Sequence, residues 1–144
     1  MTINQAISKL EQLKNDLPSL VTNAIMSDKS KVIDLNRSFQ LFQKGIDSNG
    51  NKLLAYRPTT QFIKRQKNQI FKHTTLKDTG EFYAGFRILI ENGFLYITST
   101  DDKTDSLMDK YGKNIFGLTR DNRLTLFGEI INPKLWSYLK SKNL

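Results

Sequence analysis

The sequence predicts an α+β fold, with N-terminal helices, a central antiparallel β-hairpin or small sheet, and C-terminal helices. Near both ends of the chain, apolar residues recur every three to four positions, which is the spacing of an amphipathic helix. Residues 82–99 are instead rich in aromatic and β-branched side chains, which is typical of strands. The order of helices, hairpin and helices, without internal repeats, therefore favours α+β.

The length of the chain, 144 residues, suits one domain. A domain of this size buries roughly 70% of its unfolded surface and needs neither a disulfide nor a metal to fold. We therefore expect a single domain over residues 1–144. Its parts are a helical N-terminal part (1–44), a turn-rich basic arm (46–77), and the hairpin with the C-terminal helices (78–144).

The helical spacing of residues 3–26 contains Pro18. Proline lacks an amide donor and clashes with the preceding turn, so it should kink this helix or start a second one, which Asp16 could cap. A further helix should follow and stop at Gly45. We expect four apolar residues on one face of that helix, namely Val32, Leu35, Phe39 and Phe42.

Residues 46–60 are predicted to form turns, with a tight reversal at Asn49-Gly50. The acidic and amide residues from Asp47 onward resemble a calcium loop, but Lys52 and Pro58 stand where an EF-hand needs glycine and glutamate. We therefore expect no calcium there. Residues 61–75 have few apolar side chains and should form an extended basic arm or loop, with at most one helical turn and free to move in the isolated protein.

The hairpin is expected to have strands near residues 83–90 and 94–99, divided by Glu91-Asn92-Gly93. Its alternation should place three apolar side chains on one face, namely Phe86, Ile88 and Ile90. A polar loop at 100–105 and a short helix at about 104–110 should follow.

Residues 119–142 are again predicted to be helical, with Thr119 as the N-cap. We expect Pro133 to break this helix and a short last helix to follow, with apolar residues at Leu135, Trp136, Tyr138 and Leu139. Before the break, an apolar stripe should consist of Leu124, Phe127, Ile130 and Ile131.

The net charge of +8 is concentrated in one stretch, because residues 52–77 contain seven basic and no acidic residues. Such a patch attracts nucleic acid or an acidic protein surface, and a solvated basic loop is the alternative reading. The candidate partner or DNA contacts are Lys52, Arg57, Lys64, Arg65, Lys67, Lys72 and Lys77.

The sequence gives little support for catalysis. It has no cysteine and only one histidine, so thiol chemistry, cysteine zinc sites and histidine clusters are excluded. His73 lies in a basic stretch, is expected to be solvated, and has no evident positioning partner. We expect no catalytic residues, no cofactor and no metal site.

The tripeptide Asp78-Thr79-Gly80 carries the catalytic carboxylate in aspartic proteases, where two carboxylates share one proton. Here Lys77 precedes the aspartate and Glu81 follows the glycine, and a neighbouring cation opposes a shared proton. The simpler interpretation is a turn before a strand, in which the side chains of the aspartate and threonine bond to nearby backbone.

No apolar run approaches the ~20 residues of a membrane span. The first residues also lack the basic-then-apolar profile of a signal peptide. We therefore expect a soluble protein made in the cytoplasm, without a membrane partner.

Several short motifs occur in a fixed order from about residue 36 to the end of the chain. They are FQKGIDSNGNKLLAY, RPTTQFIK, TLKDTGEFYAGF, FLYITS, MDKYGKNIFG and IFGLTRDNRLTLFGEI. This series resembles the bacteriophage virion-morphogenesis, or tail-completion, family, with Tyr56 standing where that family has a tryptophan. The motif residues are Gly50, Tyr56, Leu76, Thr79, Gly80, Phe82, Tyr111, Gly112, Phe116 and Gly117.

The resemblance implies a structural protein of the virion without catalysis, assembled in the host cytoplasm. Members of that family act in tail completion or head–tail joining and commonly form oligomeric rings at the neck or the end of the tail tube. The implied partners are further copies of this chain, other neck, connector or tail-tube proteins, and DNA in the channel. A basic nucleic-acid-binding accessory protein is the alternative that the charge of residues 52–77 leaves open.

Overall fold

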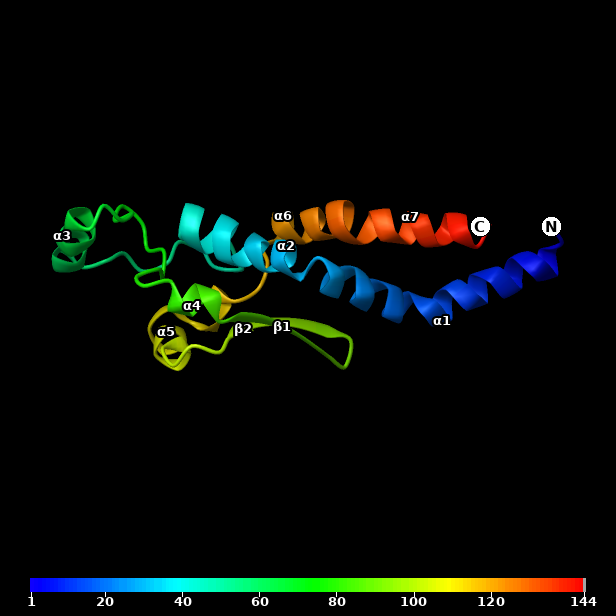
Figure 1. The fold of residues 1–144 in the computed structure, drawn as a ribbon, viewed down its shortest axis with the longest axis horizontal. Coiled ribbons are helices and arrows are strands. Elements are labelled where there is room, and N and C mark those ends of the chain that lie inside the picture. Colours follow the sequence, from blue (N-terminus) through cyan, green and yellow to red (C-terminus); the bar gives the residue numbers. More distant parts are fainter. Residues whose placement is uncertain (144) are drawn as a thin grey trace. The chain divides into compact units, whose positions relative to one another are not determined.

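The computed structural model describes residues 1–143 and confirms the α+β class (Figure 1). One antiparallel hairpin lies between helical segments in the chain order. The elements are α1 (Ile3–Ser27), α2 (Lys29–Asp34), η1 (Leu35–Phe42), α3 (Pro58–Gln66), α4 (Glu81–Ala84), β1 (Phe86–Glu91), β2 (Phe94–Ser99), α5 (Thr104–Tyr111), η2 (Lys113–Ile115), α6 (Arg120–Thr125), η3 (Leu126–Ile131) and α7 (Asn132–Ser141).

The contacts of the chain divide it into two compact units. One unit, called here the helical unit, consists of residues 1–29 and 124–143, and the other, called the hairpin unit, consists of residues 30–123. The expectation of a single domain stays a prediction.

In the helical unit, α1 begins with a capping box in which Thr2 and Gln5 exchange hydrogen bonds. The helix continues through Pro18, so the predicted start of a second helix at this proline is wrong. Asp16, the expected cap, instead accepts a 2.5 Å hydrogen bond from the hydroxyl of Tyr138 on α7, and this bond raises the pKa of that tyrosine.

Further contacts hold α1 against α7 in an antiparallel pair. The Lys9 ammonium donates to the carbonyl of Asn143 at 3.3 Å, and the Lys134 ammonium lies 3.6 Å from the Asp28 carboxylate. These contacts lie on both sides of Pro18 along the helix. They explain why the loss of one backbone hydrogen bond at the proline does not end α1.

The C-terminal residues form one helical run from Arg120 to Ser141. Thr119 is its N-cap, as predicted, because the Asn122 amide donates to the Thr119 hydroxyl at 3.2 Å. Pro133 does not break the run. It stands directly after the π-helix η3, where hydrogen bonds between residues five apart already replace the i→i−4 pattern that a proline disrupts.

The predicted apolar stripe is correct only in part. Ile130 and Ile131 are buried with Leu126, but the side chains of Leu124 and Phe127 are 60% and 53% exposed. In a π-helix the hydrogen bonds join residues five apart, so the faces turn relative to α-helical spacing. The π-helix η1 of the hairpin unit also departs from α-helical spacing, although its first residue, Leu35, is buried as expected.

In η1 the predicted face is altered by the π-helical geometry. Phe39 is exposed, while Asn36, Gln40 and Leu41 are buried. The expected stop at Gly45 is confirmed, since this glycine has a φ of +63°. A Cβ at this position would lie 2.8 Å from the carbonyl oxygen of Thr74.

The buried amides of Asn36 and Gln40 bind the backbone of residues 115–119. Asn36 donates to the carbonyl of Ile115 at 2.9 Å and accepts from the amide of Gly117 at 3.0 Å. Gln40 donates to the carbonyl of Gly117 at 2.9 Å and accepts from the amide of Thr119 at 2.8 Å. We call these four bonds the amide ladder.

The turn at Asn49-Gly50 is confirmed, with Gly50 at a φ of +82°. The Asp47 carboxylate accepts hydrogen bonds from the amides of Asn49 and Asn51, both at 2.9 Å. The expectation of an extended arm at residues 61–75 is wrong at its start, because α3 occupies Pro58–Gln66. Proline at the first helical position favours this helix, because its φ is already helical and no amide is needed there.

The hairpin is confirmed. β1 and β2 pair in an antiparallel register from Phe86↔Ser99 to Glu91↔Phe94. Asn92 and Gly93 both have positive φ, as a tight I′-type turn requires. The expected inward face is also correct, since Phe86 is buried and its alternate neighbours on β1 are half-buried.

The first strand starts later than predicted, because residues 81–84 form the short helix α4. Gly85 separates the two, and a Cβ there would lie only 2.5 Å from the Ser99 hydroxyl. In the hairpin unit, the rings of Phe82, Tyr83, Phe86 and Phe116 pack together with centroid distances of 5.1–6.1 Å. The predicted short helix after the hairpin is present as α5.

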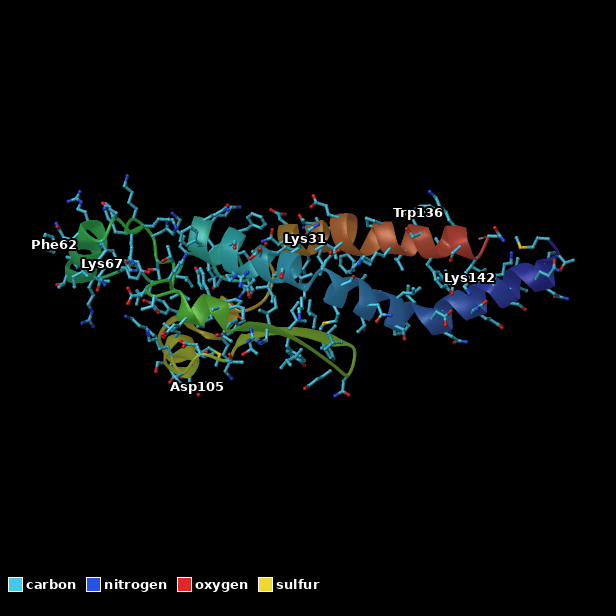
Figure 2. All side chains as sticks on the ribbon, in the orientation of Figure 1. Lys31, Phe62, Lys67, Asp105, Trp136 and Lys142 are labelled. Atoms are coloured by element: carbon cyan, nitrogen blue, oxygen red, sulfur yellow. The ribbon has the colours of Figure 1, made fainter. Side chains whose placement is uncertain are left out.

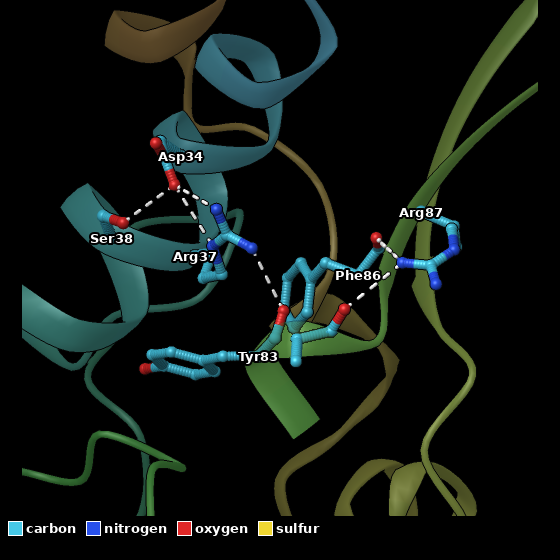
Figure 3. Close-up of polar contacts among 7 residues, drawn as sticks. Asp34, Arg37, Ser38, Tyr83, Phe86 and Arg87 are labelled. Carbon is cyan, nitrogen blue, oxygen red and sulfur yellow. Dashed lines mark hydrogen bonds and ion pairs between the residues drawn. The ribbon is translucent and has the colours of Figure 1, made fainter. Parts of the chain in front are cut away.

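Arg37 connects η1 to α4 (Figure 3). Its guanidinium donates to the Asp34 carboxylate at 2.6 and 3.1 Å and to the carbonyl of Tyr83 at 3.1 Å. The Ser38 hydroxyl donates to the same carboxylate at 3.0 Å. The arginine thereby fixes the end of the short helix that precedes β1.

Within residues 1–143, none of the helices combines the length and the apolar character that crossing a bilayer would require.

We predict that Gln40→Glu destabilises the chain by about 2–3 kcal/mol at neutral pH, because the buried side chain would place a carboxylate against the carbonyl of Gly117 and lose a partly buried hydrogen bond. Gln43→Glu, an exposed position just after η1, is the matched control and should change the free energy of unfolding by less than about 0.5 kcal/mol. Urea denaturation measures both. Equal stability of the two variants would contradict the importance of the amide ladder.

Candidate partner-binding pocket

The hairpin unit contains an open pocket of about 160 Å³. Four stretches of the chain contribute to it: the segment before α3, α3 itself, the loop 76–80 with α4, and α5. Its lining consists of Tyr56, Lys64, Leu76, Lys77, Asp78, Thr79, Gly80, Phe82, Lys103, Leu107 and Tyr111.

Tyr56 shapes the wall of the pocket. Its hydroxyl oxygen accepts hydrogen bonds from the amides of Thr75 at 3.0 Å and Leu76 at 3.3 Å. Leu76 is buried and has a φ of +60°, a conformation that is uncommon for a residue other than glycine. The two bonds to Tyr56 offset part of that strain and hold the loop in its reversal.

Tyr83, which is not part of the pocket lining, supports the same loop. It is buried, and its hydroxyl donates to the carbonyl of Thr75. Burial raises the pKa of Tyr83 well above its usual value, the nearby Tyr56 adds to this, and Arg37 opposes it. Tyr83 therefore acts as a neutral hydrogen-bond donor that fixes the loop.

The Asp78-Thr79-Gly80 stretch forms a turn, as expected. Gly80 has a φ of +91°, and the Thr79 hydroxyl accepts from the amide of Glu81 at 3.4 Å. The Asp78 side chain is exposed and lies 3.6 Å from the ammonium of Lys67, so it does not bond to nearby backbone as predicted. The element that follows is α4 rather than a strand.

The seven basic residues proposed as contacts do not act as one exposed patch. Lys64 and Lys77 line the pocket, and Lys67 pairs with Asp78. Arg65 and Lys77 lie over the rings of Phe71 and Phe42, at 5.1 and 5.0 Å from the ring centroids. The remaining three are exposed and lie outside the pocket lining, namely Lys52, Arg57 and Lys72.

The ten motif residues fall into those that line the pocket and those with other structural roles. Six of them line it: Tyr56, Leu76, Thr79, Gly80, Phe82 and Tyr111. Gly50, Gly112 and Gly117 are at positive φ, and Phe116 packs on Phe82 at 5.8 Å. A Cβ at Gly117 would lie 3.2 Å from the Cβ of Ser48, so this glycine allows two loops to approach closely.

Sequence reasoning missed two residues of the pocket lining, one in α5 and one at its N-cap. Lys103, the residue before α5, and Leu107, within it, complete the pocket. The sequence predicts a polar loop at Lys103, where neighbouring aspartates balance the charge of the lysine. Only the fold separates it from those neighbours and directs it to this site.

His73 also differs from its predicted role as a solvated residue. Its Nε2 is 2.8 Å from the carbonyl oxygen of Phe42, and the side chain is half-buried. In the part of the chain that the structure describes, no three histidine, aspartate or glutamate side chains are grouped so that they could hold a metal ion.

Comparisons of the chain with protein-family models, with curated proteins and with solved structures found no match.

Tyr83 gives the stability of the chain a defined pH dependence. The pKa of Tyr83 is raised in the folded state. Its contribution to the free energy of unfolding is therefore complete below about pH 10, which is the pKa of a tyrosine in the unfolded chain, and is lost as the pH rises beyond it. The free energy of unfolding should therefore fall by up to about 1.4 kcal/mol per pH unit from this group above pH 10. In Tyr83→Phe this part of the slope should vanish.

Chemical denaturation between pH 9 and 11 measures this slope. Tyr96→Phe is the control, since Tyr96 is an exposed tyrosine of β2. A Tyr83→Phe variant with the same alkaline slope as the wild type would contradict the assignment.

Proposed function

We propose that the chain is a structural subunit of a bacteriophage virion that acts in tail completion or head–tail joining as part of a homo-oligomeric ring. The observation that carries the proposal is the gathering of six motif residues, dispersed between positions 56 and 111, in one pocket. A series that is ordered in sequence and converges in space is expected of one recognition surface. The proposal assigns the chain no catalysis, cofactor or metal.

Exposed apolar side chains support a role in assembly. On α1, Ile3, Ile7 and Leu10 follow helical spacing and are 80%, 48% and 61% exposed. Trp136 on α7 is also exposed, and Figure 2 shows its side chain directed away from α1. Exposed apolar residues on one helix face are typical of surfaces that another protein covers.

The hairpin and α3 also present apolar side chains. Phe94 and Tyr96 of β2 are exposed, and so is Phe62 on α3. In a ring each subunit uses two different surfaces, so exposed patches on separate elements are suited to heterologous contacts. The partners in this proposal are further copies of the chain and neighbouring neck, connector or tail-tube proteins.

The alternative proposal is a nucleic-acid-binding accessory protein. Its support is limited to exposed cations of residues 52–77, because Lys64 is buried and Lys67 is paired with Asp78. This alternative predicts DNA binding by the free protein that weakens steeply with salt and weakens further when Lys52, Arg57 and Lys72 are replaced by glutamine. DNA contacts that occur only inside an assembled ring would fit the first proposal.

Electron microscopy of particles made without the chain tests the proposal. We expect heads and tails that are not joined, or tails whose ends are malformed. Supplying the wild-type chain should restore joined particles.

In native mass spectrometry the purified chain should form closed oligomers. Ile7→Glu should reduce this self-association at least about tenfold by placing a charge on an apolar contact face, with the exposed Gln12→Glu on the same helix as control. Normal, joined and infectious particles made without the chain would contradict the proposal.

A further inference from the structure

Lys64 is a buried cation without a carboxylate partner. The residue is only 8% exposed, its ammonium donates to the carbonyl of Lys77 at 2.8 Å, and it lies 4.9 Å from the centroid of the Tyr56 ring. No carboxylate of residues 1–143 forms an ion pair with it. An ammonium has three donors, and a buried charge without a counter-ion is unfavourable.

The pocket beside Lys64 has an excess of positive charge. Lys64, Lys77 and Lys103 line it, and the only acidic residue of the lining is Asp78. The lining therefore carries a net charge of +2. The Asp78 carboxylate is itself 3.6 Å from the ammonium of Lys67, which lies outside the lining, so its repulsion of an incoming anion is reduced.

The walls of the pocket are largely apolar. Leu76, Phe82 and Leu107 contribute side chains, and the rings of Tyr56 and Tyr111 complete the lining. A ligand that matches these walls needs a short apolar stem that ends in one negative charge. Lys64 would then serve as the counter-ion at the end of the stem.

The size of the pocket limits the choice of ligand. Sites for drug-sized molecules and cofactors measure about 300–1,000 Å³, whereas this pocket measures about 160 Å³. It can accept one side chain but not a nucleotide. In a nucleic acid, each phosphate is flanked by two sugars, which keep its charge out of a small apolar-walled pocket.

We propose that this pocket binds the carboxylate of a glutamate or aspartate side chain from a partner protein, with Lys64 as its buried counter-ion. The inference rests on the proposed function for the source of the side chain, a neighbouring protein in the assembly. The carboxylate chemistry itself rests on Lys64 and the pocket lining.

A titration of the isolated full chain, followed by NMR, tests the proposal. N-acetyl-glutamate N-methylamide is the probe, and its uncharged isostere, N-acetyl-glutamine N-methylamide, is the matched control. We expect saturable shifts of the Leu76, Thr79 and Leu107 signals with the glutamate probe, and at least tenfold weaker binding of the glutamine probe. A dinucleoside monophosphate, whose phosphate is flanked by two sugars, should also bind at least tenfold more weakly. Equal binding of the three probes, or no saturable shift with glutamate, would overturn the proposal.

Substitutions locate the counter-ion. Lys64→Met keeps the apolar stem and removes the charge, so it should weaken glutamate binding at least tenfold while the chain stays folded, because a buried charge is removed. Lys103→Gln, at an exposed position of the lining, should weaken binding severalfold without any risk to the fold. Lys72→Gln, at an exposed position outside the lining, should not weaken it. Loss of binding with Lys72→Gln but not with Lys103→Gln would contradict the site.

The test separates this inference from the proposed function. Glutamate binding that requires Lys64, together with normal virions in the absence of the chain, would remove the virion role and leave the pocket chemistry standing. If particles fail to join without the chain but the chain does not bind glutamate, the virion role would stand and the pocket chemistry would be removed.

Discussion

The amide ladder is the interaction on which the hairpin unit depends. Asn36 and Gln40 lie on η1 and satisfy both polar groups of Gly117 as well as groups of Ile115 and Thr119. Without it, residues 115–119 would carry buried backbone groups without partners, at a cost of about 1–3 kcal/mol each. With it, Phe116 is held against Phe82 and α4. Because α4 directly follows the loop that lines the pocket, the buried side-chain amides of Asn36 and Gln40 indirectly fix the position of the pocket.

The overall order of elements could be predicted because local signals agree with the fold. The hairpin followed from alternation and from Asn92-Gly93, and the capping of the C-terminal helix followed from Thr119. Two of the errors, on the buried faces of η1 and η3, share a physical origin. Apolar spacing was read with an α-helical period, while η1 and η3 are π-helical, so Phe39 and Phe127 were assigned to buried faces that they do not occupy.

The site shows a different limit of sequence reasoning. Six of the eleven lining residues belong to the motif series, although the sequence predicted no pocket there. Charge counting gave the seven cations of residues 52–77 equal weight, yet only the fold distinguishes them. Burial turns Lys64 inward, pairing occupies Lys67, and α5 brings in Lys103 from a segment of balanced charge. Each of these depends on contacts between residues far apart in the chain.

Charge and apolar surface have separate roles in the assembly that we propose. The exposed apolar residues of α1 and the hairpin provide contact area, which favours association but discriminates poorly between partners. The pocket adds discrimination. A neutral side chain that filled it would exclude water from Lys64 and leave the ammonium without a counter-ion, whereas an acidic side chain would complete the ion pair. The buried cation, which is unfavourable in the isolated chain, thus makes binding selective. A partner without a carboxylate at this point binds more weakly, because the ammonium of Lys64 then stays buried without a counter-ion.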